Sequence, residues 1–177
     1  MSMKKGVKAS SVQKIGVQCS MVRKIISGGQ TGADRAALDF AIQHGIPHGG
    51  WIPSGREAED GPLPERYQLE EMPTADYSER TKQNVIDSDG TVIISHGTLT
   101  GGSAFTLEVL EKQRGLWLHL DMENLQVGEA AAHLLAWLAL NRIEVLNVAG
   151  PCQSEDPKIY RTTCEVLQAA LSIKLLG

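Results

Sequence analysis

The sequence lacks paired cysteines, a long apolar run and an excess of basic residues. Its 177 residues include three cysteines, an odd number, and these are not spaced as metal ligands. We therefore expect reduced thiols and a cytoplasmic protein. The longest apolar run, residues 130–140, is too short to cross a bilayer. These absences argue against a disulfide-stabilised secreted fold and against a membrane protein.

Acidic residues outnumber basic ones, and the formal net charge is −4. Residues 1–20 hold four lysines and no acidic residue, so residues 21–177 keep 13 of the 17 basic side chains and all 21 acidic ones. An acidic body argues against a nucleic-acid partner. We expect residues 1–20 to be a flexible basic extension or a tag remnant, and residues 21–177 to form one domain.

Two common phosphate-binding motifs are also absent, the Walker pattern and the dinucleotide fingerprint G-x-G-x-x-G. Instead, short apolar strands alternate with amphipathic helices. This alternation predicts an α/β fold of three layers, a Rossmann-like parallel sheet with helices on both faces. Strands are predicted at 22–27, 91–95, 116–120 and 144–150, with a short strand and turn in 45–55, and helices at 77–87, from 103, at 127–141 and after 156.

The first helix is predicted to begin at a loose capping box made by Thr31 and Asp34. Its inner face is predicted to carry Ala37, Leu38, Ala41 and Ile42. Asp156 is predicted to cap the last helix, whose inner face carries Ile159, Thr163, Val166, Leu167 and Ala170.

Residues 54–76 are rich in Pro, Gly, Asp and Glu and are too long for an ordinary loop. Such loops are usually functional or mobile. One interpretation is a lid from which Arg56 contacts a phosphate over Gly29 while Trp51 stacks on a base. The alternative is a solvated loop.

Three predicted strands end in small-residue loops that lead into helices: GGQTGAD, GTLTGGSAF and AGPCQSEDP. Backbone N–H groups at a helix N-terminus favour an anion, and glycine lets the chain approach one closely. Each loop alone could be a tight turn, but three at one sheet edge predict a cleft that binds a phosphate-bearing ligand. The predicted binding residues are Gly28, Gly29, Gln30, Thr31, Gly32, Asp34, Arg56, Thr100, Gly101, Gly102, Ser103, Gly150 and Ser154.

Residues 75–110 resemble the central segment of the lysine-decarboxylase-like proteins, which include the cytokinin-activating phosphoribohydrolases. Arg80, Asp89, the pair Gly101–Gly102 and Glu108 match that family's pattern, although the residues around Glu108 depart from it. The resemblance implies that Arg80 and Glu108 are catalytic and act on an N-glycosidic bond between a base and a ribose phosphate. The alternative for this pair is a surface ion pair.

Residues 145–167 resemble the amino-terminal strand, loop and helix of the same enzymes, although here they come last. The body, residues 21–177, is therefore similar to the circularly permuted YpsA-like proteins, often labelled molybdenum carrier proteins. This resemblance implies a carrier that binds a phosphate-bearing cofactor or nucleotide, with the molybdenum cofactor as one candidate. Two alternatives stay open: a phosphoribohydrolase that cleaves a nucleoside monophosphate, and a sensor of a nucleotide-derived signal.

The histidines show no pair at metal-ligand spacing, so no metal site is predicted. His96, at the end of a core strand beside a glycine loop, is the one candidate ligand among them. Trp137 is predicted to point away from the Leu134 and Leu135 stripe of its helix. An aromatic side chain outside the inner face predicts a subunit contact and a homo-oligomer.

Overall fold

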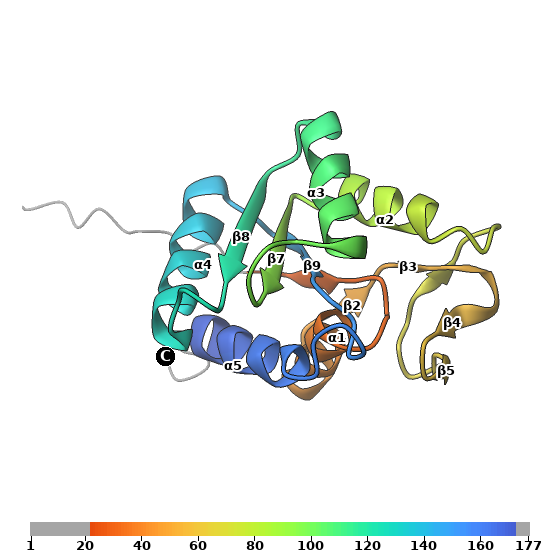
Figure 1. Cartoon of the computed structure of the whole chain (residues 1–177), viewed down its shortest axis with the longest axis horizontal. Coiled ribbons are helices and arrows are strands. Elements are labelled where there is room, and N and C mark those ends of the chain that lie inside the picture. The colour runs from red at the N-terminus through yellow and green to blue at the C-terminus, as the bar shows by residue number, and fades with distance from the viewer. Residues whose placement is uncertain (1–21, 173–177) are drawn as a thin grey trace, which may run out of the picture.

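The computed structural model describes residues 22–172, which are arranged as a parallel sheet between two layers of helices (Figure 1). The sheet strands are β1 (Lys24–Ile26), β2 (His48–Gly49), β7 (Gly90–Ser95), β8 (Trp117–Asp121) and β9 (Val145–Ala149). They pair in the order β2-β1-β9-β7-β8, all parallel. The predicted three-layer, Rossmann-like α/β fold is confirmed. Residues 1–20, predicted as an extension, lie outside the described residues, and the single domain stays a prediction.

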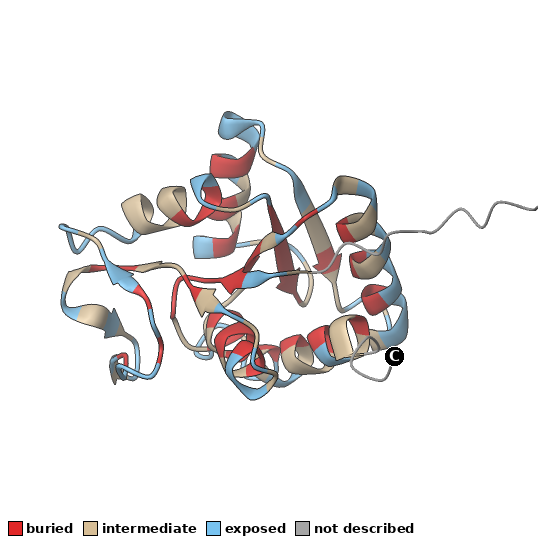
Figure 2. Cartoon of the chain, turned by 180° about the vertical axis from the view of Figure 1, so that it is seen from behind, coloured by how far each residue is buried: buried red, intermediate tan, exposed pale blue. Residues whose placement is uncertain are grey.

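Five helices cover the two faces of the sheet. On one face, α5 (Ile159–Leu171) contacts both α1 (Ala33–Gln43) and α4 (Val127–Asn141). On the other face, α2 (Tyr77–Ile86) contacts α3 (Gly101–Gln113) (Figure 1). Side chains along β7 point alternately to the two faces of the sheet. Val92 and Ile94 belong to the hydrophobic core under α1, α4 and α5. Ile93 packs with Val85 and Val109 in the core under α2 and α3. Buried residues accordingly follow the strands and the inner faces of the helices (Figure 2).

β9 occupies the centre of the sheet although it follows the other sheet strands in the sequence. Two buried side-chain hydrogen bonds fix it on either side. Ser27 Oγ donates to the Val148 carbonyl over 2.7 Å, and Asn147 Nδ2 donates to Thr91 Oγ1 over 3.1 Å. Since all five strands are parallel, the loops after β1, β7 and β9 leave from the same edge.

Residues 51–71, the β3–β6 segment, form a compact unit beside this edge. It contains β3 (Trp51–Ile52), a 3-10 turn (Ser54–Arg56), β4 (Glu57–Ala58), β5 (Gly61–Pro62) and β6 (Glu70–Glu71). β3 pairs with β6, and β4 with β5. An apolar cluster fixes the segment on α1: Leu38, Ile52, Leu63, Tyr67 and Leu69. The segment is therefore packed on α1 by its apolar side chains, while its acidic residues Glu57, Glu59 and Asp60 are exposed, as the interpretation as a solvated loop expected.

The predicted capping box of the first helix is wrong. α1 starts after Gly32, which makes no side-chain cap. Thr31 instead contacts Glu59, and the Asp34 carboxylate accepts from the Gln30 N–H over 3.3 Å. The Thr31 side chain is thus used in a contact with a distant residue and not to cap the helix. Ile42 is also wrongly placed on the inner face, because it is 41% exposed.

The last two helices follow the predicted faces more closely. α5 buries all five predicted inner residues. Its N-cap is Lys158, without a side-chain cap, so the prediction that Asp156 caps the helix is wrong. Asp156 Oδ1 accepts from the Lys158 N–H over 3.0 Å just before the helix. Trp137 of α4 packs partly buried against the core, close to Gly90. It therefore offers no argument for a subunit contact, and the homo-oligomer stays a prediction. No helix within residues 22–172 has the length and apolar character needed to span a membrane.

Two leucines of α4 provide a matched test of this packing. Leu134 is fully buried and Leu140 is 84% exposed. We expect Leu134→Ala to lower the free energy of unfolding by about 2–5 kcal/mol, the range for a cavity left in a core. Leu140→Ala should change it by less than about 0.5 kcal/mol. Urea unfolding of both variants measures the difference, and equal effects would contradict this orientation of α4.

Candidate functional site

A cavity of about 410 Å³ opens at the edge of the sheet where β1, β7 and β9 end. Each of the three predicted loops contributes to its wall. α2 adds further residues to the lining. Those lining the cavity are Gln30, Asp34, Tyr77, Ser78, Arg80, Thr81, Gly101, Gly102, Phe105, Thr106, Ala149, Gly150, Cys152 and Glu155. The three loops therefore converge in space; their role in binding a ligand stays a prediction.

The charged centre of the cavity is the pair Arg80 and Asp34. Arg80 Nη1 lies 3.3 Å from Asp34 Oδ2, and the two side chains are only 13% and 7% exposed. Burial raises the pKa of Asp34 above the ordinary value of an aspartate, against the opposing charge of Arg80. Arg80 Nε is buried and has no hydrogen-bond partner among the described residues. The guanidinium therefore has a buried N–H donor left over beside its contact with Asp34.

Gly28 makes room for that guanidinium. A Cβ atom at this position would lie 1.4 Å from Arg80 Nη1, so any other residue would displace Arg80. Gly32 and Gly150 allow two segments of the main chain to lie in close contact. A Cβ atom would lie 2.4 Å from the Pro151 carbonyl oxygen at Gly32, and 2.4 Å from the Ile94 carbonyl oxygen at Gly150.

Gly29 was predicted to lie at the ligand, but it lies against the apolar cluster of the β3–β6 segment. Its φ is +76°, and a Cβ atom would lie 2.9 Å from Leu63 and from Leu69. The residue thus faces the apolar cluster of the β3–β6 segment and is not among those that line the cavity. Substitution here would disturb packing before it disturbed any ligand.

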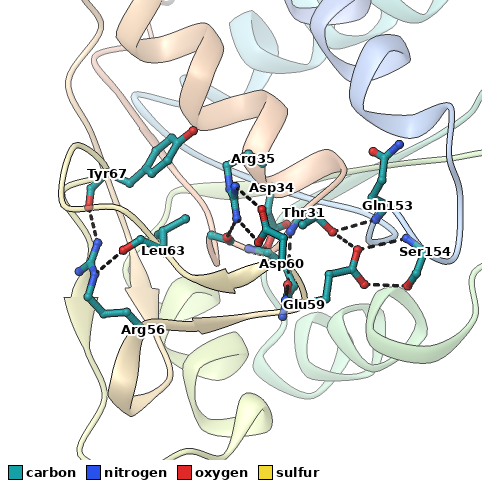
Figure 3. Close-up of polar contacts among 12 residues, drawn as sticks. Thr31, Asp34, Arg35, Arg56, Glu59, Asp60, Leu63, Tyr67, Gln153 and Ser154 are labelled. Atoms are coloured by element: carbon teal, nitrogen blue, oxygen red, sulfur yellow. Dashed lines mark hydrogen bonds and ion pairs between the residues drawn. The ribbon is translucent and has the colours of Figure 1, made fainter.

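Arg56 does not reach the cavity either. Its guanidinium donates to main-chain carbonyls of Leu63, Pro64, Tyr67 and Leu69 over 2.8–3.3 Å. Figure 3 shows the contacts with Leu63 and Tyr67. These contacts fold the β3–β6 segment around the side chain. The prediction that Arg56 contacts a phosphate over Gly29 is therefore not supported by its position.

The predicted catalytic pair is not brought together. Arg80 lines the cavity from α2, whereas Glu108 lies exposed on α3 and is not among the residues of the cavity wall. α3 begins at Gly101, so Glu108 is two turns into the helix and away from its N-terminal end. The structure therefore places Arg80 in the cavity wall and Glu108 outside it.

Thr100 and Ser103 face a second, smaller cavity of about 250 Å³. It also holds His96, whose Nδ1 lies 2.6 Å from Asp156 Oδ2. The buried Ser103 Oγ has no partner among the described residues. Glu155 lines both cavities. Within residues 22–172, no group of three or more His, Cys, Asp or Glu side chains is arranged to hold a metal ion.

Thr31 and Ser154 do not line the cavity, but they are adjacent in sequence to the lining residues Gln30 and Glu155 and so mark its rim. They share one carboxylate, that of Glu59 (Figure 3). Hydrogen bonds from Thr31 and from Ser154 lower the pKa of Glu59 to about 2, so it is ionised at neutral pH. Nothing in the sequence distinguishes Glu59 from the acidic residues around it. Tyr77, Phe105, Thr106, Cys152 and Glu155 of the cavity wall were also missed. Glu155 directly follows a predicted site residue, so position alone could have indicated it.

Comparison with known proteins agrees with the fold and the order of its strands. The model of the circularly permutated YpsA SLOG family matches residues 25–171. The chain belongs to this family. A solved structure of a protein from Syntrophus aciditrophicus SB, named "Putative molybdenum carrier protein", is similar at 55% sequence identity with a TM-score of 0.84. The match covers 86% of this chain and 96% of that one. The search of curated proteins found no match.

The raised pKa of Asp34 gives this member of the family a testable pH dependence. A carboxyl whose pKa is higher in the folded state contributes stability below its ordinary pKa and loses it as pH rises through the folded pKa. An asparagine cannot ionise and escapes this loss. We expect the urea midpoint of Asp34→Asn, relative to that of the wild type, to rise as the pH is raised from 4 to 7. A difference that does not vary with pH would contradict the assignment.

Proposed function

We propose that the protein binds a phosphate-bearing small molecule, a nucleotide or a phosphorylated cofactor, in the cavity around Arg80. The observation that carries this proposal is the state of the Arg80 guanidinium. A guanidinium offers five N–H donors, and here it is buried, with one carboxylate partner and an Nε atom that has none among the described residues. An oxyanion in the cavity would give it the charged, two-oxygen partner for which its planar fork is suited.

The surroundings of Arg80 support the same ligand class. Gly101 and Gly102, in the first turn of α3, line the cavity, so the positive end of that helix faces the ligand. A volume of about 410 Å³ suits one small molecule. Tyr77 and Phe105 add aromatic surface against which a ring can pack.

Family membership and the name of the similar solved protein favour a carrier over an enzyme. In this proposal the ligand is a phosphorylated cofactor such as the molybdenum cofactor, held through its phosphate by Arg80 and the α3 N-terminus. The exposed position of Glu108 argues in the same direction, because the phosphoribohydrolase alternative loses its carboxylate. A sensor of a nucleotide-derived signal would use the same binding step and then need a partner protein.

Binding can be tested with adenosine 5′-monophosphate as the probe, by calorimetry. We expect Arg80→Ala to weaken binding by about 1.5–3 kcal/mol, because a charge-assisted contact is lost. Arg161 offers a matched control, since its side chain is 85% exposed on α5 and paired with Glu165. Arg161→Ala should bind the probe as the wild type does. Equal binding by Arg80→Ala and wild type would refute the proposal.

Turnover distinguishes the carrier from the hydrolase. We expect no free adenine when the wild type is incubated with adenosine 5′-monophosphate and the mixture is separated by chromatography. Glu108→Gln should leave binding unchanged, because its side chain does not line the cavity. Release of adenine by the wild type that is lost in Glu108→Gln would make the protein an enzyme. Native mass spectrometry of the freshly purified protein would then identify the ligand it carries.

A further inference from the structure

The tip of the β4–β5 hairpin places one carboxylate where the loops after β1 and β9 meet. Ser154 donates to Glu59 twice, from N–H to Oε1 over 3.1 Å and from Oγ to Oε2 over 2.7 Å. Thr31 Oγ1 accepts the Gln153 N–H over 3.0 Å, which leaves its own proton for Glu59 Oε1 (Figure 3). Three donors from two loops thus converge on one anion.

The neighbouring carboxylate of the same tip is bound as well. Asp60 accepts from Arg35 Nη2 over 3.0 Å and from Arg35 Nη1 over 3.1 Å, a two-pronged pair (Figure 3). The Glu59 N–H donates to Gln30 Oε1 over 2.9 Å, and Gln30 lines the cavity. The contacts of the tip are therefore polar and reach the wall of the site.

We propose that Thr31 and Ser154 form an oxyanion site that Glu59 fills as an internal substitute for a phosphate group of the ligand. The proposal rests on the function proposed above and adds a second anchor to it, beyond Arg80. A phosphate group entering this site displaces Glu59, and the hairpin tip leaves the rim with it.

The donor set fits this exchange, because a carboxylate and a phosphate are both acceptors and the same N–H and O–H groups serve either. Both loops are those that the sequence predicts to bind a phosphate. Glu59 and Asp60 are exposed, so their departure uncovers little apolar surface. It also removes two negative charges from the rim and frees Arg35 from its ion pair with Asp60. Since Glu59 is ionised at neutral pH, the concentration of the competing anion governs the exchange.

The test is calorimetric titration of the full chain with inorganic phosphate and with adenosine 5′-diphosphate, whose two phosphate groups can occupy the Arg80 anchor and the oxyanion site together. Glu59→Ala removes the internal competitor, and we expect it to bind both probes about tenfold more tightly than the wild type. Glu57→Ala, in β4 of the same hairpin, removes an equal charge that makes no contact with Thr31 or Ser154 in the described structure. It should bind as the wild type does. In a Glu59→Ala background, Ser154→Ala should abolish the gain.

The outcomes separate this inference from the proposed function. If Glu59→Ala and wild type bind the nucleotide equally while Arg80→Ala loses it, the oxyanion site is refuted and the proposed function stands. If Glu57→Ala gains as much as Glu59→Ala, the effect is one of net charge and the site is refuted. If neither the wild type nor Glu59→Ala binds either probe, both proposals fail.

Discussion

The ion pair of Arg80 and Asp34 is the interaction on which the site depends. It joins α2 to the first turn of α1 across the base of the cavity, where neither side chain is well hydrated. A buried pair repays its desolvation poorly, and here burial outweighs the attraction enough to raise the pKa of Asp34. The pair is therefore better understood as a way to keep a cation in a dry place than as a source of stability. Residue 28 is a glycine because the guanidinium of Arg80 occupies the space that a side chain at this position would need.

The glycines of the first loop illustrate how one motif can meet several demands at once. Gly28 clears the Arg80 guanidinium, Gly29 turns the chain onto the apolar cluster of the β3–β6 segment, and Gly32 lets α1 approach the loop at Pro151. Each is required by a neighbouring part of the protein itself. A glycine-rich loop after a strand thus indicates that another group lies close to the main chain of the loop, and this group can belong to the protein rather than to a ligand.

The fold was predictable because buried faces leave a periodic record, as in α5, where all five inner residues were identified. The resemblance indicated that the segment with β9 had moved to the end of the chain, but it did not indicate the central place of that strand in the sheet. The convergence of the three loops was predicted from parallel strands. What the sequence could not reveal was how exposed polar groups are used. Arg56 is surrounded by four carbonyls and Glu59 is held by two distant loops, contacts that leave no periodic trace. Glu108 matched the pattern of the lysine-decarboxylase-like proteins, but the residues around it depart from that pattern.

The central position of β9 has a consequence for biosynthesis. The strand that separates β1 from β7 leaves the ribosome after both of them, and its Val148 carbonyl meets Ser27 across 121 residues of chain. Until β9 is present, the edges of β1 and β7 that pair with it have no partner, and the five-stranded sheet cannot form. Contacts of such long range slow folding and expose strand edges meanwhile. The complete sheet can therefore form only after β9 has been synthesised.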